Sequence, residues 1–165
     1  MGWRRPVSGS TTATAPPTET NRAEPLRLIR HRWSGLRLRC WPGQLHQLQG
    51  LLDAHSFWAR GRTAAQLNQM LRGSQAVVSA WRGNRLVGFG RASSDGVFRA
   101  VLWDVVVAAD EQGRGLGRRL VQTLLTDPAL KGVERIYLMT TNSAGFYTQL
   151  GFSSGGSQNL MVREH

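Results

Sequence analysis

The chain has 165 residues, of which 41% are hydrophobic, and carries a formal net charge of +11 at pH 7. A chain of this length supports a single domain whose core is large enough to fold without disulfides or a structural metal. No apolar run approaches the roughly 20 residues that a membrane-spanning helix needs. Composition therefore predicts a soluble globular protein without a membrane partner.

The positive charge comes almost entirely from arginine, since Lys131 is the single lysine among 21 basic residues. The planar, permanently charged guanidinium suits phosphate, so nucleic acid, an anionic membrane surface and a polyphosphate-bearing cofactor all fit the charge. Much of the basicity precedes Cys40, where only Glu19 and Glu24 oppose the arginines. No RNA-type motif with interleaved aromatic residues is present, so we predict no nucleic-acid partner.

Cys40 is the only cysteine of the chain. One cysteine excludes a disulfide within the chain and cannot by itself build a zinc site. No His-containing nucleophile motif accompanies it, and His46 and His55 lack the i, i+4 spacing of a helical metal pair. We therefore predict a buried structural cysteine and no metal site.

Residues 1–25 are rich in Ser, Thr, Ala and Pro and contain few large apolar residues. Such a segment cannot bury enough surface to offset its conformational entropy, so we predict a disordered extension before a folded domain at 26–165. The segment also has the arginine-bearing, acid-poor composition of an organelle transit peptide. We favour a solvated tail and a cytoplasmic protein, with a plastid location as the alternative.

Hydrophobic periodicity and turn residues predict the secondary structure of the folded part. The expected elements, in chain order, are a strand at 36–41, a helix at 44–55, a helix capped by Thr63 and ended by Gly73, strands at 76–81 and 85–91 around a Gly83-Asn84 turn, an uninterrupted strand at 97–107, a helix at 115–125, a strand at 133–139, a short helix at 143–150 and a last strand at 158–162. Three consecutive antiparallel strands followed by alternating strands and helices indicate an α/β protein with a mixed sheet.

The most informative segment runs from Val105 to Arg118, where a β-branched strand enters a glycine-dense turn that opens into a helix. Glycines allow a tight turn and close approach to a ligand, and a helix N-terminus offers unpaired N–H groups to a pyrophosphate. A P-loop would need Gly-Lys-Ser/Thr, but two arginines stand there. A dinucleotide fold would need a different glycine spacing and an earlier strand. The third pattern, Gln-x-x-Gly-x-Gly, is filled by Gln112, Gly115 and Gly117.

This third pattern resembles the acetyl-CoA motif of the GNAT superfamily of N-acetyltransferases. A second motif agrees, because Phe146-Tyr147 and Gly151-Phe152 match the family's Phe-Tyr-x-x-x-Gly-Phe. The resemblance spans about residues 36–165, and residues 81–107 are similar to the cyanobacterial and plastid branch, whose plant members include serotonin and protein-lysine acetyltransferases. It implies the GNAT fold, a mixed and mostly antiparallel sheet flanked by helices.

The resemblance also implies acetyl-CoA as the co-substrate. The backbone of 105–107 would pair with the pantetheine amides, and the N–H groups of 113–118 would hold the pyrophosphate. Arg114, Arg118 or Arg119 could add charge-assisted contacts, with a solvated helix face favoured for Arg119. Asn142 would cap the next helix, reach the pantetheine arm, or do both. The expected cofactor-binding residues are Val105, Val106, Val107, Gln112, Gly113, Arg114, Gly115, Leu116, Gly117, Arg118 and Asn142.

Tyr147 is the catalytic acid that the resemblance implies. The motif would place its phenol near the CoA sulfur, where it can protonate the thiolate that leaves when an amine attacks the thioester. Its neighbour Phe146 is expected to be a core aromatic.

Asp104 is the candidate base for the amine. Strand alternation would place it on one face with Leu102 and Val106 while Trp103 points the other way. A carboxylate in an apolar strand is costly unless it is paired or solvated by a cleft, which suggests a functional role. A structural hydrogen bond, with water as the base, is the alternative.

The expected activity is transfer of the acetyl group of acetyl-CoA to a primary amine, either a small molecule or a protein amine, by direct attack in a ternary complex. Trp58, beside Phe57, is a candidate for lining the amine pocket. The alternative is a CoA-binding or sensing module that has kept the fold and lost turnover. Family members often dimerise, so a homodimer is one expected state.

Overall fold

The computed structural model describes residues 24–31, 42–154 and 159–164. The described part contains a five-stranded sheet in the order β1-β2-β3-β4-β5. Its strands are β1 (Leu26–His31), β2 (Ala76–Arg82), β3 (Arg85–Ser94), β4 (Arg99–Val107) and β5 (Arg135–Tyr137). Its α-helices are α1 (Pro42–His55), α2 (Ala64–Arg72), α3 (Leu116–Leu125) and α4 (Ala144–Thr148), and short 3-10 turns include η2 (Phe57–Ala59) and η3 (Ala109–Glu111).

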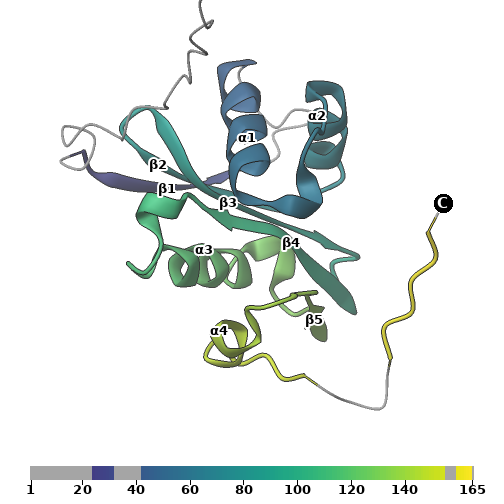
Figure 1. Ribbon diagram of the computed structural model, residues 1–165. Coiled ribbons are helices and arrows are strands. Elements are labelled where there is room, and N and C mark those ends of the chain that lie inside the picture. Colours follow the sequence, from purple (N-terminus) through teal and green to yellow (C-terminus); the bar gives the residue numbers. More distant parts are fainter. Residues whose placement is uncertain (1–23, 32–41, 155–158, 165) are drawn as a thin grey trace, which may run out of the picture.

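The sheet is mixed and mostly antiparallel, as predicted. Strands β1 to β4 pair antiparallel with their neighbours, and β5 pairs parallel with β4. Helices α1 and α2 cover one face of the sheet and α3 covers the other, while α4 and β5 lie together beside β4 (Figure 1). The α/β class with flanking helices is therefore confirmed.

Helix α3 packs directly against β3, which carries glycines where the helix crosses it. A Cβ atom on Gly88 would lie 2.9 Å from Leu120 Cδ1, and one on Gly90 would lie 3.0 Å from Leu124 Cδ1. Both leucines are fully buried. The missing side chains thus let the helix approach the strand backbone directly, which fixes the position of the helix N-terminus relative to β4.

Most of the predicted helices and the hairpin are confirmed within a few residues. Helix α2 has the predicted cap, since Thr63 and Gln66 form a reciprocal capping box, and it ends at Gly73. Strand β5 is shorter than the predicted 133–139, and β4 begins two residues later than predicted because Asp95 closes the preceding turn with its side chain. The strand expected at 36–41 and the predictions for Cys40 and most of the N-terminal extension lie outside the described residues.

Two predictions about the ends of the domain differ from the structure. Strand β1 was not predicted, although Leu26 and Leu28 alternate with exposed neighbours and both pack against the core. The last strand, expected at 158–162, is wrong for its described part, because residues 159–162 form no strand. Their side chains are exposed, Met161 by 90%, so this apolar run has no buried face to hold it against the sheet.

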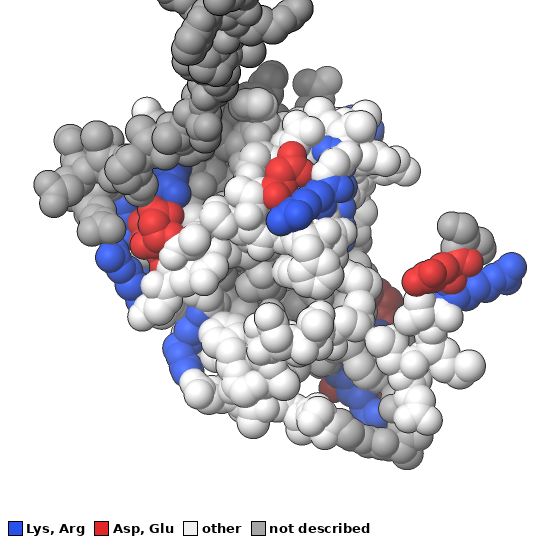
Figure 2. Space-filling model, viewed as in Figure 1, with Lys and Arg blue, Asp and Glu red and all other residues white. Residues whose placement is uncertain are grey.

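Some charged side chains on the described surface form ion pairs, such as Arg85 with Asp110 and Arg99 with Glu134. In Figure 2 the visible acidic residues each have basic neighbours, and the middle of this face carries no charge. Of the described helices, none has the length and apolar character to cross a membrane.

Candidate active site

Strand β4 pairs with β5 along only part of its outer edge, and the part from 102 to 107 is here called the free edge. The two strands pair only from Arg99↔Arg135 to Val101↔Tyr137, and β5 then ends. Among the described residues, no strand pairs with the outer edge of β4 from 102 to 107. Main-chain N–H and C=O groups on such an edge need partners, so this edge can accept an extended ligand in the way that sheets accept an added strand.

A bulge interrupts β4 at the centre of this edge. Phe89 pairs with Val106 and Arg91 pairs with Trp103, so three steps along β4 oppose two steps along β3. Asp104 has a φ of 50°, the left-handed region that non-glycine residues rarely adopt. An extra residue in one strand breaks the alternation of side chains between faces.

The bulge corrects the predicted orientation of Trp103. Cross-strand partners share a face, so Trp103 lies on the face of Arg91, whose guanidinium carbon is 5.6 Å from the Trp103 ring centroid. Asp104 accepts a hydrogen bond from the same arginine and therefore lies on that face too. Asp104 and Trp103 point to one side of the sheet, not to opposite sides.

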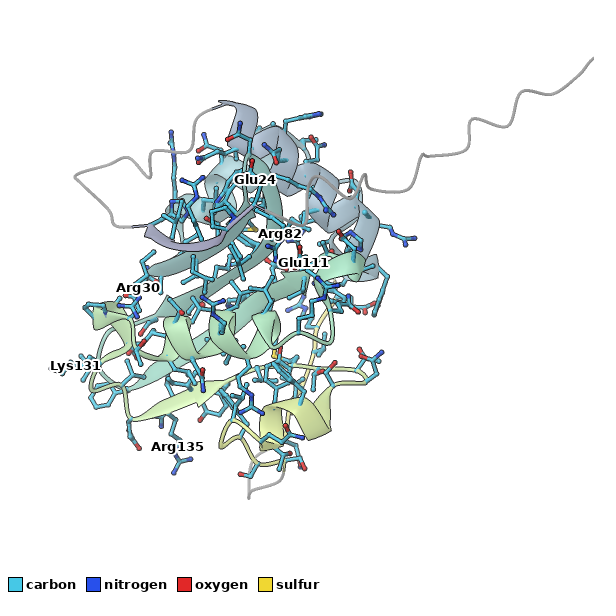
Figure 3. All side chains as sticks on the ribbon, turned by 90° about the vertical axis from the view of Figure 1, so that its left-hand side faces the viewer. Glu24, Arg30, Arg82, Glu111, Lys131 and Arg135 are labelled. Carbon is cyan, nitrogen blue, oxygen red and sulfur yellow. The ribbon has the colours of Figure 1, made fainter. Side chains whose placement is uncertain are left out.

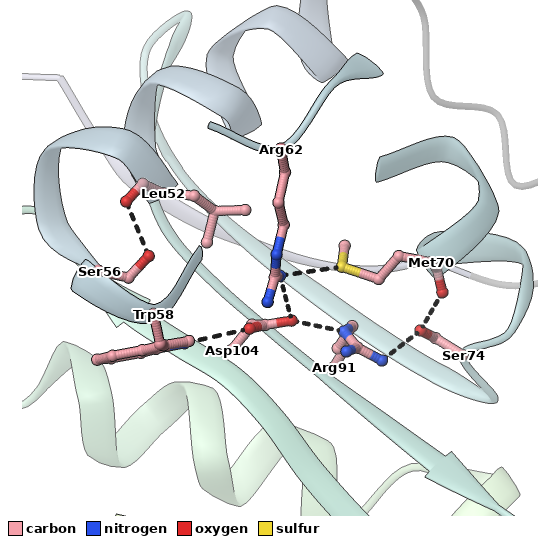
Figure 4. Close-up of polar contacts among 8 residues, drawn as sticks. All are labelled: Leu52, Ser56, Trp58, Arg62, Met70, Ser74, Arg91 and Asp104. Atoms are coloured by element: carbon pink, nitrogen blue, oxygen red, sulfur yellow. Dashed lines mark hydrogen bonds and ion pairs between the residues drawn. The ribbon is translucent and has the colours of Figure 1, made fainter. Parts of the chain in front are cut away.

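Asp104 is almost fully enclosed by donors, its side chain being 3% exposed. Its Oδ2 accepts from Arg91 Nε at 2.8 Å and from Arg62 Nη1 at 3.1 Å, and its Oδ1 accepts from Trp58 Nε1 at 3.3 Å (Figure 4). The cost of burying this carboxylate in an apolar strand is thus offset by two guanidinium groups and an indole N–H.

These groups belong to a cavity of about 500 Å³ that opens between β4 and the segment leading into α4. Its walls come from η2, the loop before α2, β3, β4 and residues 138–147. The lining residues are Phe57, Trp58, Arg62, Arg91, Leu102, Trp103, Asp104, Val105, Leu138, Met139, Thr140, Thr141, Asn142, Ser143 and Tyr147. The predicted site residues Asp104, Val105, Asn142 and Tyr147, distant in sequence, thus meet in one cavity, and Trp58 lines the same cavity.

Tyr147 presents its phenol to this cavity from α4. The ring packs edge-on against Phe146 at 4.9 Å and Phe152 at 5.9 Å between centroids. Burial raises the pKa of the Tyr147 hydroxyl above its ordinary value of 10.0. The hydroxyl therefore stays protonated at neutral pH, as a proton donor must.

The glycine turn follows β4 directly and leads into α3. Gly113 and Gly115 have φ values of 73° and 77°, which glycine adopts without strain. Gly115 is the N-cap of α3, and the first hydrogen bond to its carbonyl comes from Arg119. The N–H groups of residues 116–118 therefore have no acceptor within the helix, and they lie at the positive end of its dipole.

Two ion pairs hold the start of the turn against the β2–β3 hairpin. Arg85 binds Asp110 through two hydrogen bonds of 2.6 and 2.7 Å, and Arg82 binds Glu111 through bonds of 2.5 and 2.9 Å. Arg82 lies between Glu111 and Glu24, whose carbonyl it also contacts at 2.7 Å (Figure 3). These hydrogen bonds from the arginines lower the pKa of the Asp110 and Glu111 carboxyl groups.

Helices α3 and α4 are linked next to the turn. Arg118 Nη2 donates to Gln149 Oε1 at 2.8 Å, and a Cβ on Gly117 would lie 3.4 Å from the Phe146 ring. Arg114 and Arg119 are exposed at the surface of this region, and Arg118 is half-buried. Gln112, at the start of the turn, donates from Nε2 to the Val107 carbonyl at 3.0 Å.

The capping role expected of Asn142 is not found. Ser143 is the N-cap of α4 and makes no side-chain cap hydrogen bond, and Asn142 Oδ1 instead accepts from the Ser143 hydroxyl at 3.3 Å. Asn142 lines the cavity, so its position agrees with the other expectation, contact with a ligand there.

Sequence reasoning missed Arg62 and Arg91 as site residues. Arg91 is a charged residue within the apolar strand β3, two positions after the buried Phe89 and so on the same face. A charged residue within an apolar strand is also what marked Asp104. Arg62 precedes the Thr63 cap in a loop, and nothing in its neighbourhood marks it. Among the described residues, no group of three or more His, Cys, Asp or Glu side chains could hold a metal ion.

Comparison with known proteins places this site in a family. Residues 32–152 match the model of the acetyltransferase (GNAT) family. Serotonin N-acetyltransferase 2, chloroplastic, from Oryza sativa subsp. japonica is 50% identical over 70 residues, which cover 42% of this chain and 35% of the rice protein. GCN5-related N-acetyltransferase 1, chloroplastic, from Arabidopsis thaliana is 37% identical over 113 residues, which cover 67% of this chain and 56% of the relative.

A solved structure shows the same fold. A GNAT-family protein from Xanthomonas campestris pv. campestris superposes with a TM-score of 0.68 and 25% identity, covering 84% of this chain and 94% of that protein. The family model covers most of the chain, including the bulged strand, the glycine turn and the aromatic segment that carries Tyr147. The chain belongs to the GNAT acetyltransferase family.

Proposed function

We propose that the chain transfers the acetyl group of acetyl-CoA to a primary amine, with both substrates bound together. The observation that carries the proposal is the convergence of three features around β4: a free strand edge, a glycine turn that opens α3, and the Tyr147 phenol in the cavity. The names of the two plant relatives support an amine acceptor. Both names also say chloroplastic, which favours the plastid alternative over the cytoplasmic location.

The residues around β4 fit acetyl-CoA. The main chain of 105–107 would pair with the pantetheine amides along the free edge, since that edge lies between the bulge and the turn. The N–H groups of 113–118 would hold the pyrophosphate, because this segment forms the turn and the helix N-terminus. Arg114 is exposed beside the turn and would add a charge-assisted contact. Acetyl-CoA supplies the acetyl group as an activated thioester.

Tyr147 acts as the general acid in this proposal. As the amine nitrogen bonds to the acetyl carbon, the carbon–sulfur bond breaks and the sulfur takes the phenolic proton. The raised pKa of Tyr147 suits this step, because the group arrives protonated at neutral pH. The amine loses its proton to water, and water returns a proton to the Tyr147 phenolate.

We assign Asp104 a positioning role. Its carboxylate accepts hydrogen bonds from two guanidiniums and an indole, so most of its acceptor sites are engaged within the protein. It would instead orient Arg62 and Arg91 within the cavity. Its role as the base stays the competing prediction, and the pH dependence of a variant distinguishes the two.

Cofactor binding is tested by thermal unfolding. We expect acetyl-CoA to raise the melting temperature while NAD and ATP do not, with about 2.7 kcal/mol of stabilisation when the ligand is at 100 times its Kd. Gly115→Val should abolish the shift, because its side chain would block the approach of the pyrophosphate to the glycine turn. Gly132→Val is the matched control, because Gly132 is also exposed, has a positive φ of 88° and would place a Cβ atom in open space, but lies away from the site. A shift of equal size with NAD would contradict the assignment.

Turnover is tested with a panel of primary amines by following CoA release. Release with at least one amine supports the transferase. A thermal shift with acetyl-CoA but no release with any amine would instead support a binding or sensing module.

A further inference from the structure

The described walls of the cavity hold two arginines and one carboxylate. Arg62 and Arg91 both bind Asp104, and no other acidic residue is found among the described lining residues. Two guanidiniums against one carboxylate leave one uncompensated positive charge in the walls. Other acids near this face are engaged elsewhere, as Asp53 is by the Gly61 N–H at 2.9 Å.

Both arginines keep donors that the described part of the chain does not use. Arg62 donates from Nη1 to Asp104 and to Met70 Sδ, and Arg91 donates from Nε to Asp104 and from Nη1 to Ser74. No described residue accepts from Arg62 Nε or Nη2, or from Arg91 Nη2. The Arg62 side chain is 30% exposed and the Arg91 side chain 14%. Their donors therefore lie in a partly dehydrated cavity, where the attraction between a guanidinium and a bound anion is stronger than in water.

The remaining walls are aromatic and apolar. Phe57 and Trp58 stand at the cavity mouth, 67% and 51% exposed, and their rings meet edge-on at 5.1 Å. Trp103 lies under the Arg91 guanidinium. Exposed aromatic rings around a cavity offer contact area to an apolar body of a ligand.

We propose that the acceptor is an amine that also carries a carboxylate, of the aromatic amino-acid type, and that Arg62 and Arg91 bind this carboxylate. The inference rests on the proposed acetyl transfer at the same cavity. A carboxylate would neutralise the excess charge and take planar, paired hydrogen bonds from a guanidinium. A polyamine would meet charge of its own sign, whereas the positive walls favour the uncharged, nucleophilic form of an amine.

Matched substrate pairs test the proposal, because each pair differs only by the carboxylate. The pairs are tryptamine with tryptophan, phenethylamine with phenylalanine, and histamine with histidine, each measured as kcat/KM by CoA release. We expect the carboxylate-bearing member of at least one pair to be favoured by roughly 10-fold or more, the size of a charge-assisted hydrogen bond. Equal or better use of the plain amine in all three pairs would overturn the inference.

Variants then assign the preference to the arginines. Arg62→Gln should lower the ratio of kcat/KM for the acid over its plain amine by roughly 10- to 100-fold, mainly through KM. The acetyl-CoA thermal shift should persist, which verifies folding. Arg91→Gln should act in the same direction, and Arg60→Gln is the control because Arg60 is exposed and does not line the cavity.

The outcomes separate this inference from the proposal on which it rests. An unchanged ratio in Arg62→Gln and Arg91→Gln, with activity retained, would refute carboxylate binding and leave acetyl transfer intact. No CoA release from any amine, acidic or plain, would refute acetyl transfer and this inference together.

Discussion

Replacing Tyr147 by Phe removes one hydroxyl group and leaves the ring. The ring packs against Phe146 and Phe152, and these contacts do not involve the oxygen. No described residue hydrogen-bonds to the hydroxyl, so the substitution breaks no internal bond. We therefore expect the free energy of unfolding to change by less than about 0.5 kcal/mol.

The expected effect on catalysis is much larger. General acid catalysis contributes about 10²- to 10⁴-fold, so kcat should fall by this factor, equivalent to roughly 2.7 to 5.4 kcal/mol in the barrier. The KM for acetyl-CoA should stay within about twofold, because the turn and the β4 edge are untouched. The loss should shrink with thioesters whose leaving thiol is more acidic, since such a thiolate needs less protonation.

The assay is steady-state CoA release, with melting temperature as the check on folding. Tyr137→Phe is the matched control, because Tyr137 is the other tyrosine of the chain and does not line the cavity. Its kcat should stay within about twofold of wild type. A Tyr147→Phe enzyme that turns over a good acceptor at the wild-type rate would refute the acid assignment.

Three further predictions concern the site and the core. Asp104→Asn should raise the KM for the acceptor and leave the pH profile of kcat unchanged; a loss that steepens at low pH would show that Asp104 is the base. Gly88→Ala should cost about 1–3 kcal/mol in thermal or denaturant unfolding, because the new methyl would meet Leu120, whereas Gly50→Ala in α1, with open space around it, should be neutral or stabilising. Asp110 has its pKa lowered from 3.8 by its arginine partner, so its contribution to stability is present above about pH 5 and is lost as pH falls through the lower, folded-state value. The melting temperatures of wild type and Asp110→Asn should therefore differ at pH 7 and converge as the pH falls below 3.8 and through the lower folded-state value.

Local sequence signals predicted the parts of the site that depend on local chemistry. Gly113 and Gly115 adopt positive φ, which is what a glycine-dense turn before a helix requires. Thr63 caps the start of α2 and Gly73 its end, as predicted from the preference of Thr for N-caps and of Gly for C-caps. Such features depend on a few neighbouring residues, so one sequence suffices to predict them.

The bulge at Asp104 could not be predicted in this way. Its positive φ is unfavourable for an aspartate, and the chain adopts it where Arg62, Arg91 and Trp58 provide donors for the carboxylate. These partners lie 13 to 46 positions away in sequence. Alternation was the best local assumption, and long-range ion pairs overrode it.

At residues 159–162, local sequence signals predicted a strand that the structure does not contain. Apolar and β-branched residues predicted a strand, but propensity alone does not supply a partner edge, and the described part of the sheet does not pair with this segment. The roles of the cofactor-binding residues and the nature of the N-terminal extension stay predictions.

The bulge also determines which changes this strand can tolerate. Asp104→Gly, reachable by one nucleotide change, would suit the left-handed backbone better than aspartate does, because glycine adopts positive φ freely. It would also remove the only acidic group from the described cavity walls and leave Arg62 and Arg91 without a protein counter-ion there. Deleting Asp104 would instead restore regular pairing, since Trp103 and Val106 would then lie two steps apart, as Arg91 and Phe89 do, and Val105 would keep its face. The cavity can thus change its charge at this one position without turning residues 105–107 to another face, a route by which related chains could diverge in substrate.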